Sequence, residues 1–160
     1  MKVTFIEIAP DRLPLTLLLE ADPSEQRIAA YLPGALGFAA SEGDEIVGAC
    51  VANLIGEQIV EIFNIAVAPG HQQRGIGSGL LRFVLENLAE KGVRRVELGT
   101  GSVGHQLTYY QRHGFRVDAV LKDHFLIHYP EPLIEHGIQH KDMLRLSLAL
   151  EPSIPVRHGQ

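Results

Sequence analysis

The first half of the chain is patterned as short strands around two short helices. Apolar runs that alternate with polar residues, or that end at glycine, proline or acidic turn residues, predict strands. Helical spacing on both sides of Asp22-Pro23 predicts two helices, and Ser24 is a suitable N-cap for the second. The elements predicted up to Pro69 are strand 3–8, helices 13–20 and 24–32, and an antiparallel meander of strands 36–41, 45–54 and 58–67.

After Pro69 the apolar pattern changes to helical spacing. Apolar residues recur at this spacing from Ile76 to Leu88, and Gly92 stands where a helix commonly ends. The elements predicted beyond that helix are strand 93–98, helix 106–113, strands 115–121 and 143–150, a turn-rich polar segment over 123–139, and a loose tail over 151–160. This order predicts an α+β (or α/β) domain with a mixed sheet over residues 1–150.

Composition and charge narrow the class of protein. The chain has 160 residues and 46% are apolar, which suits one compact domain. Its one cysteine, Cys50, excludes an intramolecular disulfide framework and argues against a cysteine-based zinc site. A net charge of −5 argues against duplex nucleic acid and favours a cationic partner. Because no apolar run is long enough for a signal peptide or a membrane span, we expect a cytoplasmic protein.

The strongest chemical signal is a glycine-rich run between a predicted strand and a predicted helix. Its sequence is Gln72-Gln73-Arg74-Gly75-Ile76-Gly77-Ser78-Gly79. Small residues at a helix start expose backbone N–H groups, and the helix dipole adds a positive field, so the run is suited to bind phosphate. A Rossmann fingerprint would need glycine in place of Leu80, and a P-loop would need a Gly-Lys-Ser or Gly-Lys-Thr that the chain lacks. Simple helix capping is the other alternative, but three glycines in five residues cost about 1 kcal/mol each in a helix.

Two motifs resemble those of one known family. Gln72-x-x-Gly75-x-Gly77 matches the Q/R-x-x-G-x-G/A motif of the GCN5-related N-acetyltransferases (GNAT superfamily). The segment from Tyr110 to Phe115 resembles the family's Y-x-x-x-G-F segment at the expected distance. The resemblance covers about residues 36–121, and residues 128–130 and 142–146 resemble an uncharacterised bacterial branch of the family. It implies a GNAT-like fold, with a mostly antiparallel twisted sheet of about six or seven strands flanked by about four helices.

The resemblance also implies acetyl-CoA as co-substrate, no metal, and a set of coenzyme-binding residues. In the family, loop amides bind the coenzyme A pyrophosphate and the pantetheine arm pairs with the end of the preceding strand. A backbone N–H near Ile65 would then stabilise the oxyanion of the thioester carbonyl. Where many GNATs carry an asparagine that binds pantetheine, either Ser102 replaces it or the contact is absent. The expected coenzyme-binding residues are Ile65, Ala66, Val67, Gln72, Gln73, Arg74, Gly75, Ile76, Gly77, Ser78 and Ser102.

Two side chains are expected to transfer protons. Glu61 is a carboxylate in an otherwise apolar strand, where burial beside Phe63 would make it a stronger base, and its offset matches the strand glutamate that histone-acetylating GNATs use as base. A water chain or a solvent-facing Glu61 are the alternatives. Tyr110 matches the family tyrosine near the coenzyme sulfur, where its phenol would protonate the departing thiolate; packing on the sheet is its alternative. Asn64 is expected only to satisfy a bulge or loop.

Histidines gather in the C-terminal third, which holds six of the eight. Two pairs of histidines four residues apart stand at the ends of segments 124–128 and 136–140. They would bind a metal only if both segments were helical, and nearby prolines and a glycine indicate loops instead. Together with Tyr129, Glu131 and Glu135, this stretch would line an acceptor pocket for a cationic amine.

These features predict an enzyme that moves the acetyl group of acetyl-CoA to a primary amine by direct attack in a ternary complex. Cys50 lies outside both motifs, so no covalent thiol intermediate is expected. The acceptor is a small-molecule amine or a protein amine, without nucleic acid or membrane as partner, and homodimers are common among such domains. The alternative is a catalytically inactive coenzyme A-binding regulatory module, against which Glu61 and Tyr110 argue. A purely structural interaction protein comes third.

Overall fold

The chain folds around one mixed sheet, and a computed structural model describes residues 2–151 of it. The strands are β1 (Val3–Ile8), β2 (Leu36–Glu42), β3 (Glu45–Gly56), β4 (Ile59–Val67), β5 (Arg95–Gly101), β6 (Arg116–Leu121), β7 (Ile134–Glu135), β8 (Ile138–Gln139) and β9 (Met143–Ala149). The α-helices are α1 (Leu15–Ala21), α2 (Glu25–Tyr31), α3 (Ile76–Glu90), α4 (His105–Arg112) and α5 (His124–His128). Two 3-10 turns are η1 (Pro10–Arg12) and η2 (Pro69–His71).

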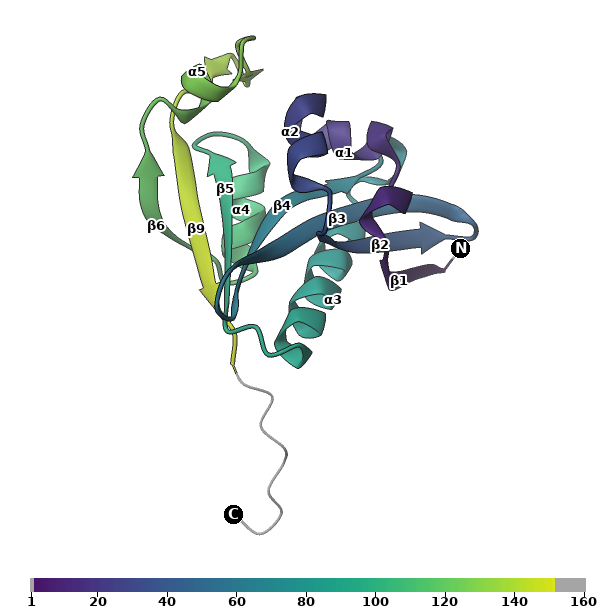
Figure 1. Ribbon diagram of the computed structural model, residues 1–160. Coiled ribbons are helices and arrows are strands. Elements are labelled where there is room, and N and C mark those ends of the chain that lie inside the picture. The colour runs from purple at the N-terminus through teal and green to yellow at the C-terminus, as the bar shows by residue number, and fades with distance from the viewer. Residues whose placement is uncertain (1, 152–160) are drawn as a thin grey trace.

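The main sheet has seven strands in the order β1-β2-β3-β4-β5-β9-β6, and only β4 and β5 pair in parallel. The predicted mixed, mostly antiparallel sheet is therefore confirmed. In Figure 1, α1 and α2 lie above the β2–β4 part of the sheet and α3 lies below it. None of the helices in residues 2–151 is long and apolar enough to cross a membrane.

Each face of the sheet is closed by an apolar stripe on its helices. Leu80, Leu81, Val84 and Leu88 of α3 are fully buried against the sheet, at the spacing that predicted this helix. On the opposite face, the shorter helices α1 and α2 bury their own leucine and isoleucine side chains. Burying a large aliphatic side chain stabilises the fold by about 1.5–3 kcal/mol, so α3 is the main anchor of the sheet.

A bulge in β4 divides the sheet into two parts. Val51 pairs with Asn64 and Ala52 pairs with Ile62, which leaves Phe63 as the extra residue of β4. β4 pairs with β5 only over Ile59–Glu61, whereas β5 is paired with β9 on its other edge along its whole length. Within residues 2–151, the edge of β4 that faces β5 consequently has no strand partner from residue 62 to 67, and the two parts of the sheet diverge (Figure 1).

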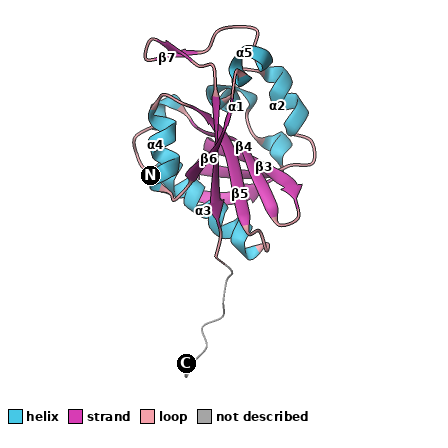
Figure 2. Cartoon of the chain, turned by 90° about the vertical axis from the view of Figure 1, so that its left-hand side faces the viewer, coloured by secondary structure: helices cyan, strands magenta, loops and turns pink. Residues whose placement is uncertain are grey.

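Two sequence-based boundaries were wrong for identifiable reasons. β5 continues to Gly101 instead of ending at Leu98, because residues 99–101 stay paired with β9. The glycines that suggested an end to the strand leave room for the side chains of Met143 and His140, which lie where Cβ atoms on Gly99 and Gly101 would be. The segment 123–139 is not only turns, since it forms α5 and the β7–β8 hairpin, which project beyond one end of the sheet (Figure 2). These elements have two to five residues each, too few for periodicity to reveal. The predicted tail over 151–160 lies, apart from its first residue, outside the described residues.

Candidate active site

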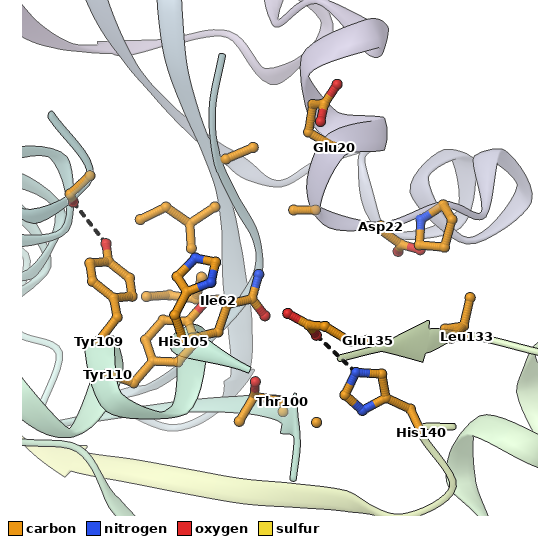
Figure 3. Close-up of a pocket in the computed structure, with 18 of the residues that line it drawn as sticks. Glu20, Asp22, Ile62, Thr100, His105, Tyr109, Tyr110, Leu133, Glu135 and His140 are labelled. Carbon is orange, nitrogen blue, oxygen red and sulfur yellow. Dashed lines mark hydrogen bonds and ion pairs between the residues drawn. The ribbon is translucent and has the colours of Figure 1, made fainter. Parts of the chain in front are cut away.

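A cleft of about 1140 Å³ opens where β4 and β5 separate. Its Gly-loop end is lined by Gln72, Gln73, Gly75, Gly77 and Ser78, and its hairpin end by Asp22, Tyr31, Tyr129, Glu135 and His140. Figure 3 shows Tyr109 and Tyr110 on one side of this cleft and Glu135 and His140 on another. The cleft therefore joins the predicted phosphate-binding loop to the predicted acceptor segment.

The Gly-loop end is built mainly from backbone. Gly75 is the N-cap of α3 with a φ of 78°, in the left-handed region that favours glycine. The Gln72 side chain donates a hydrogen bond to the Val67 carbonyl at 3.1 Å, and the Tyr109 hydroxyl donates to the Gly77 carbonyl at 2.7 Å. These contacts fix the loop against β4 and α4, and the first turn of α3 contains no acidic residue. The loop is thus suited to bind an anion through the amides at the start of α3.

Eight of the eleven predicted coenzyme-binding residues line the cleft, and three do not; for Arg74 and Ile76 the predicted contact is through the loop amides, which stays a prediction. Those that line it are Ile65, Ala66, Val67, Gln72, Gln73, Gly75, Gly77 and Ser78. The Arg74 guanidinium turns away to Glu42 at 2.7 Å, and the Ile76 side chain is buried in the core. Ser102 is exposed and does not line the cleft, whereas Thr100 of β5 does.

Two adjacent tyrosines of α4 flank the Gly loop. Tyr110 is only 7% exposed, packs edge-on against Phe115 and lines the cleft. Burial raises the pKa of Tyr110, so its phenol stays protonated at neutral pH and is able to donate a hydrogen bond. Its role as the acid stays a prediction. Tyr109 has a structural role instead, because its hydroxyl is occupied by Gly77.

Glu61 lines the cleft but is held in an ion pair. Both its carboxylate oxygens accept hydrogen bonds from Arg145 of β9, at 3.0 and 3.2 Å, and Arg145 also reaches Glu97 of β5 at 3.4 Å. The Glu61 and Arg145 side chains are 20% and 18% exposed. The expected apolar surroundings are absent, since Phe63 stacks on Tyr31 instead. The role of Glu61 as base stays a prediction. What the geometry shows is that Arg145 links Glu61 and Glu97, and we call this three-residue contact between β4, β5 and β9 the clamp.

The hairpin end contains a hydrogen-bonded cluster that the sequence did not reveal. The buried Asp22 carboxylate accepts hydrogen bonds from the Tyr31 hydroxyl at 3.1 Å, the Tyr129 hydroxyl at 3.2 Å and the Ser24 amide at 3.0 Å. Burial and the Asp22 charge raise the pKa of Tyr129 to about 12. Asn64 lies just beyond the bulge, but its side chain donates to the Tyr31 hydroxyl and to the Leu18 carbonyl of α1, so it joins β4 to the two helices α1 and α2 instead of satisfying the bulge. This cluster joins the segment around Tyr129 to α1 and α2, 107 residues away in the chain.

The predicted acceptor segment reaches the cleft only in part. Tyr129 and Glu135 line it, whereas Glu131 is exposed and does not. His124 and His128 lie on α5 with ring centroids 4.5 Å apart, but residues 2–151 contain no group of three His, Cys, Asp or Glu side chains placed to hold a metal ion. The sequence placed these residues in loops, whereas His124 and His128 lie on α5 and Glu135 lies on β7. Tyr129 follows α5, and its hydrogen bond to Asp22 holds it at the cleft.

The comparison with protein families decides the identity of this site. The family model described as Acetyltransferase (GNAT) family matches residues 5–115, about two thirds of the chain. The chain belongs to the GNAT family. Among curated relatives of this GNAT protein is "Uncharacterized N-acetyltransferase YvbK" of Bacillus subtilis, which is 43% identical over 135 residues, covering 84% of this chain and 87% of the relative.

Solved structures of other GNAT proteins share the whole fold. The IAA acetyltransferase from Bacillus cereus is 40% identical with a TM-score of 0.89, covering 93% of this chain and all of the other. A GNAT family acetyltransferase from Elizabethkingia anophelis with acetyl-CoA bound is 37% identical with a TM-score of 0.88, covering 92% of this chain and 98% of the other. The expectations of a GNAT fold and of an acetyl-CoA-dependent N-acetyltransferase are thereby confirmed.

Proposed function

We propose that this GNAT protein, as one domain over residues 1–150, transfers the acetyl group of acetyl-CoA to a primary amine by direct attack in a ternary complex. The observation that carries the proposal is the position of the free edge of β4, residues 65–67, on the same cleft as the Gly loop. An extended pantetheine arm would add to this edge as a strand does, with its phosphates at the start of α3. We retain the cytoplasm as the proposed location.

The proposed chemistry uses one cleft from end to end. The amine nitrogen attacks the thioester carbonyl carbon, the new C–N bond forms, and the carbonyl oxygen takes up negative charge beside a backbone N–H near Ile65. The C–S bond then breaks with its electron pair on sulfur, and Tyr110 supplies the proton that makes the free thiol. The nitrogen loses a proton to become an amide, which restores the proton balance.

The burial of Cys50 favours direct transfer of the acetyl group over a mechanism with a covalent thiol intermediate. Its side chain is fully buried in the core between the sheet and α3, and burial raises the pKa of its thiol. A thiol nucleophile has to be accessible and ionised, and Cys50 is neither. The acetyl group therefore passes from sulfur to nitrogen without an acyl-enzyme.

The proposal is tested by thioester consumption with a panel of amines, comparing wild type with Tyr110→Phe and Tyr109→Phe. Loss of the acid is expected to lower kcat about 100-fold in Tyr110→Phe while the Kd of acetyl-CoA is unchanged. Tyr109→Phe is the matched control, because it removes one hydroxyl from the same helix and is expected to weaken acetyl-CoA binding only a few-fold. An unaffected kcat in Tyr110→Phe would refute its acid role. Binding of acetyl-CoA without turnover by wild type would favour the inactive regulatory module.

A further inference from the structure

Four carboxylates line the cleft, and two of them are already engaged on both oxygens. Asp22 accepts hydrogen bonds from two tyrosines and a backbone amide, and Glu61 is held by Arg145. Glu20 is exposed at the rim on α1. Glu135 is the fourth, and within residues 2–151 neither lysine nor arginine lies within ion-pair distance of it. An uncompensated carboxylate on a cleft wall is suited to meet a cation.

The β7–β8 hairpin aims Glu135 into the cleft. Its turn residues His136 and Gly137 both have positive φ, 53° and 75°, as a two-residue hairpin turn requires. In Figure 3 the Glu135 side chain extends from β7 toward the interior of the cleft. The carboxylate lies against Gly104, where a Cβ atom would overlap with it. Gly104 is the N-cap of α4, so the Glu135 carboxylate reaches the start of the helix that carries Tyr110.

His140 holds this carboxylate in place. Its Nε2 atom lies 2.9 Å from Glu135 Oε1, and because an ionised carboxylate only accepts hydrogen bonds, Nε2 carries the proton. The imidazole is 11% exposed, and Nδ1 is buried without a partner in the described chain. Glu135 Oε2 is left without a hydrogen-bond partner among residues 2–151.

We propose that Glu135, positioned by His140, binds the ammonium group of the acceptor and takes its proton, and this inference rests on the proposed function. The ammonium R–NH3⁺ gives one proton to Glu135, and the resulting R–NH2 has the lone pair that attacks the thioester carbon. After transfer, Glu135 returns the proton to solvent. Glu135 would touch the substrate, whereas His140 acts through Glu135 and is a positioning residue. Glu61 then serves the clamp with Arg145 instead of proton transfer.

The test is the pH dependence of kcat/KM for wild type and Glu135→Gln, with n-butylamine, 1,4-diaminobutane, lysine and glucosamine as acceptors. With an internal base, the abundant ammonium form is the substrate. In Glu135→Gln only the free amine reacts, and for n-butylamine and 1,4-diaminobutane this form is scarce at pH 7. For these two acceptors kcat/KM is therefore expected to fall about 100-fold near pH 7, with the loss shrinking about tenfold per pH unit above that. Glucosamine, whose amine is less basic, should show a smaller loss. His140 is the titratable group in contact with Glu135. The other charged or titratable side chains that line the same cleft are Glu20, Asp22, Arg27, Glu61, His105, Arg112, His113 and the four tyrosines Tyr31, Tyr109, Tyr110 and Tyr129.

Three further variants separate this role from structural damage. Glu131→Gln removes the same charge from the same segment outside the cleft and is expected to keep the wild-type profile. His140→Leu is expected to lower kcat about tenfold, and His140→Gln, which keeps an N–H donor, to restore part of it. The Kd of acetyl-CoA should stay at the wild-type value in all of them.

The outcomes distinguish this inference from the function on which it rests. A wild-type pH profile in Glu135→Gln, or the tenfold slope appearing in Glu61→Gln instead, would overturn the inference while leaving the acetyltransferase intact. Absence of turnover by wild type with every amine would remove the proposed function and this inference together.

Discussion

The two ends of the cleft differ in whether backbone groups or side chains form them. At the Gly-loop end the chemistry belongs to the backbone: the amides at the start of α3 and the free edge of β4. At the hairpin end it belongs to side chains that come from α1, α2 and the segment 129–140. A backbone site depends on local conformation, which a short motif specifies. A side-chain site depends on which distant segments meet, and the fold alone decides that.

The largest expected effect is the loss of coenzyme binding in Gly77→Glu. A Cβ atom at Gly77 would make ordinary contacts with Val67 at 3.5 Å and with the Tyr109 hydroxyl at 3.7 Å, so the position has room for a side chain. A carboxylate there would repel the phosphates proposed to bind the loop, and we expect the Kd of acetyl-CoA to rise at least about 100-fold. Calorimetric titration measures this directly.

The matched control for that variant is Gly70→Glu. Gly70 lies in η2 before the loop, is exposed, does not line the cleft, and has no atom within 4 Å of a Cβ built on it. The same added charge is therefore expected to change the Kd less than about twofold. Equal binding by Gly77→Glu and wild type would mean that the Gly-loop end does not hold the phosphates.

The sequence predicted most of the fold because its elements are long or have distinct ends. The apolar stripe of α3 predicted that helix, and Ser24 caps α2 as expected, accepting a hydrogen bond from the Arg27 amide at 3.2 Å. The Gly loop was predictable for the same reason, since positive φ at Gly75 and small residues at a helix start are local requirements.

The sequence could not predict the partners of the cleft's side chains. Asp22 precedes a proline and looked like a helix break, yet it accepts hydrogen bonds from Tyr31 and Tyr129 in the same cluster. Glu61 looked isolated in an apolar strand because Arg145 lies 84 residues further along the chain. Such pairs follow from the strand order β4-β5-β9, which no local pattern encodes.

An effect of intermediate size, on the free energy of unfolding, is expected for Arg145→Met, which breaks the ion pair with Glu61. Without the guanidinium, the half-buried Glu61 would lose its ion-pair partner within residues 2–151 and lie beside Glu97, which keeps its pair with Arg95, and we expect the free energy of unfolding to fall by about 2 kcal/mol. Adding Glu61→Gln should recover part of this loss, because it removes one of the two like charges. Denaturant unfolding measures both.

The control is Lys122→Met, which breaks the Lys122–Asp142 pair with Lys122 75% exposed. Surface pairs contribute about 0.5 kcal/mol or less, so this variant should unfold close to wild type. If Arg145→Met is as stable as Lys122→Met, Arg145 is not a clamp, and Glu61 is free to act as the predicted base.

The smallest expected effect is the loss of folding stability at low pH caused by two histidines, one near the Gly-loop end of the cleft and one on α5. Burial lowers the pKa of His113, which lies 3.3 Å from Ser78 at the Gly-loop end, and burial together with the charge of His128 lowers the pKa of His124 on α5. The unfolded chain therefore binds more protons than the folded one, and stability falls as the pH drops below the unfolded value of about 6.5.

Replacing each histidine by glutamine should remove its share of that loss, about 0.5 kcal/mol after solvent screening, between about pH 7 and pH 5. The carboxylates with lowered pKa, Glu42, Asp118 and Asp142, titrate below this window and do not interfere. Unfolding by denaturant at both pH values gives the slope for each variant. A shallower slope in His113→Gln alone would assign the acid sensitivity to the Gly-loop end, and one in His124→Gln alone to α5. Unchanged slopes in both would contradict the burial of these rings as its cause.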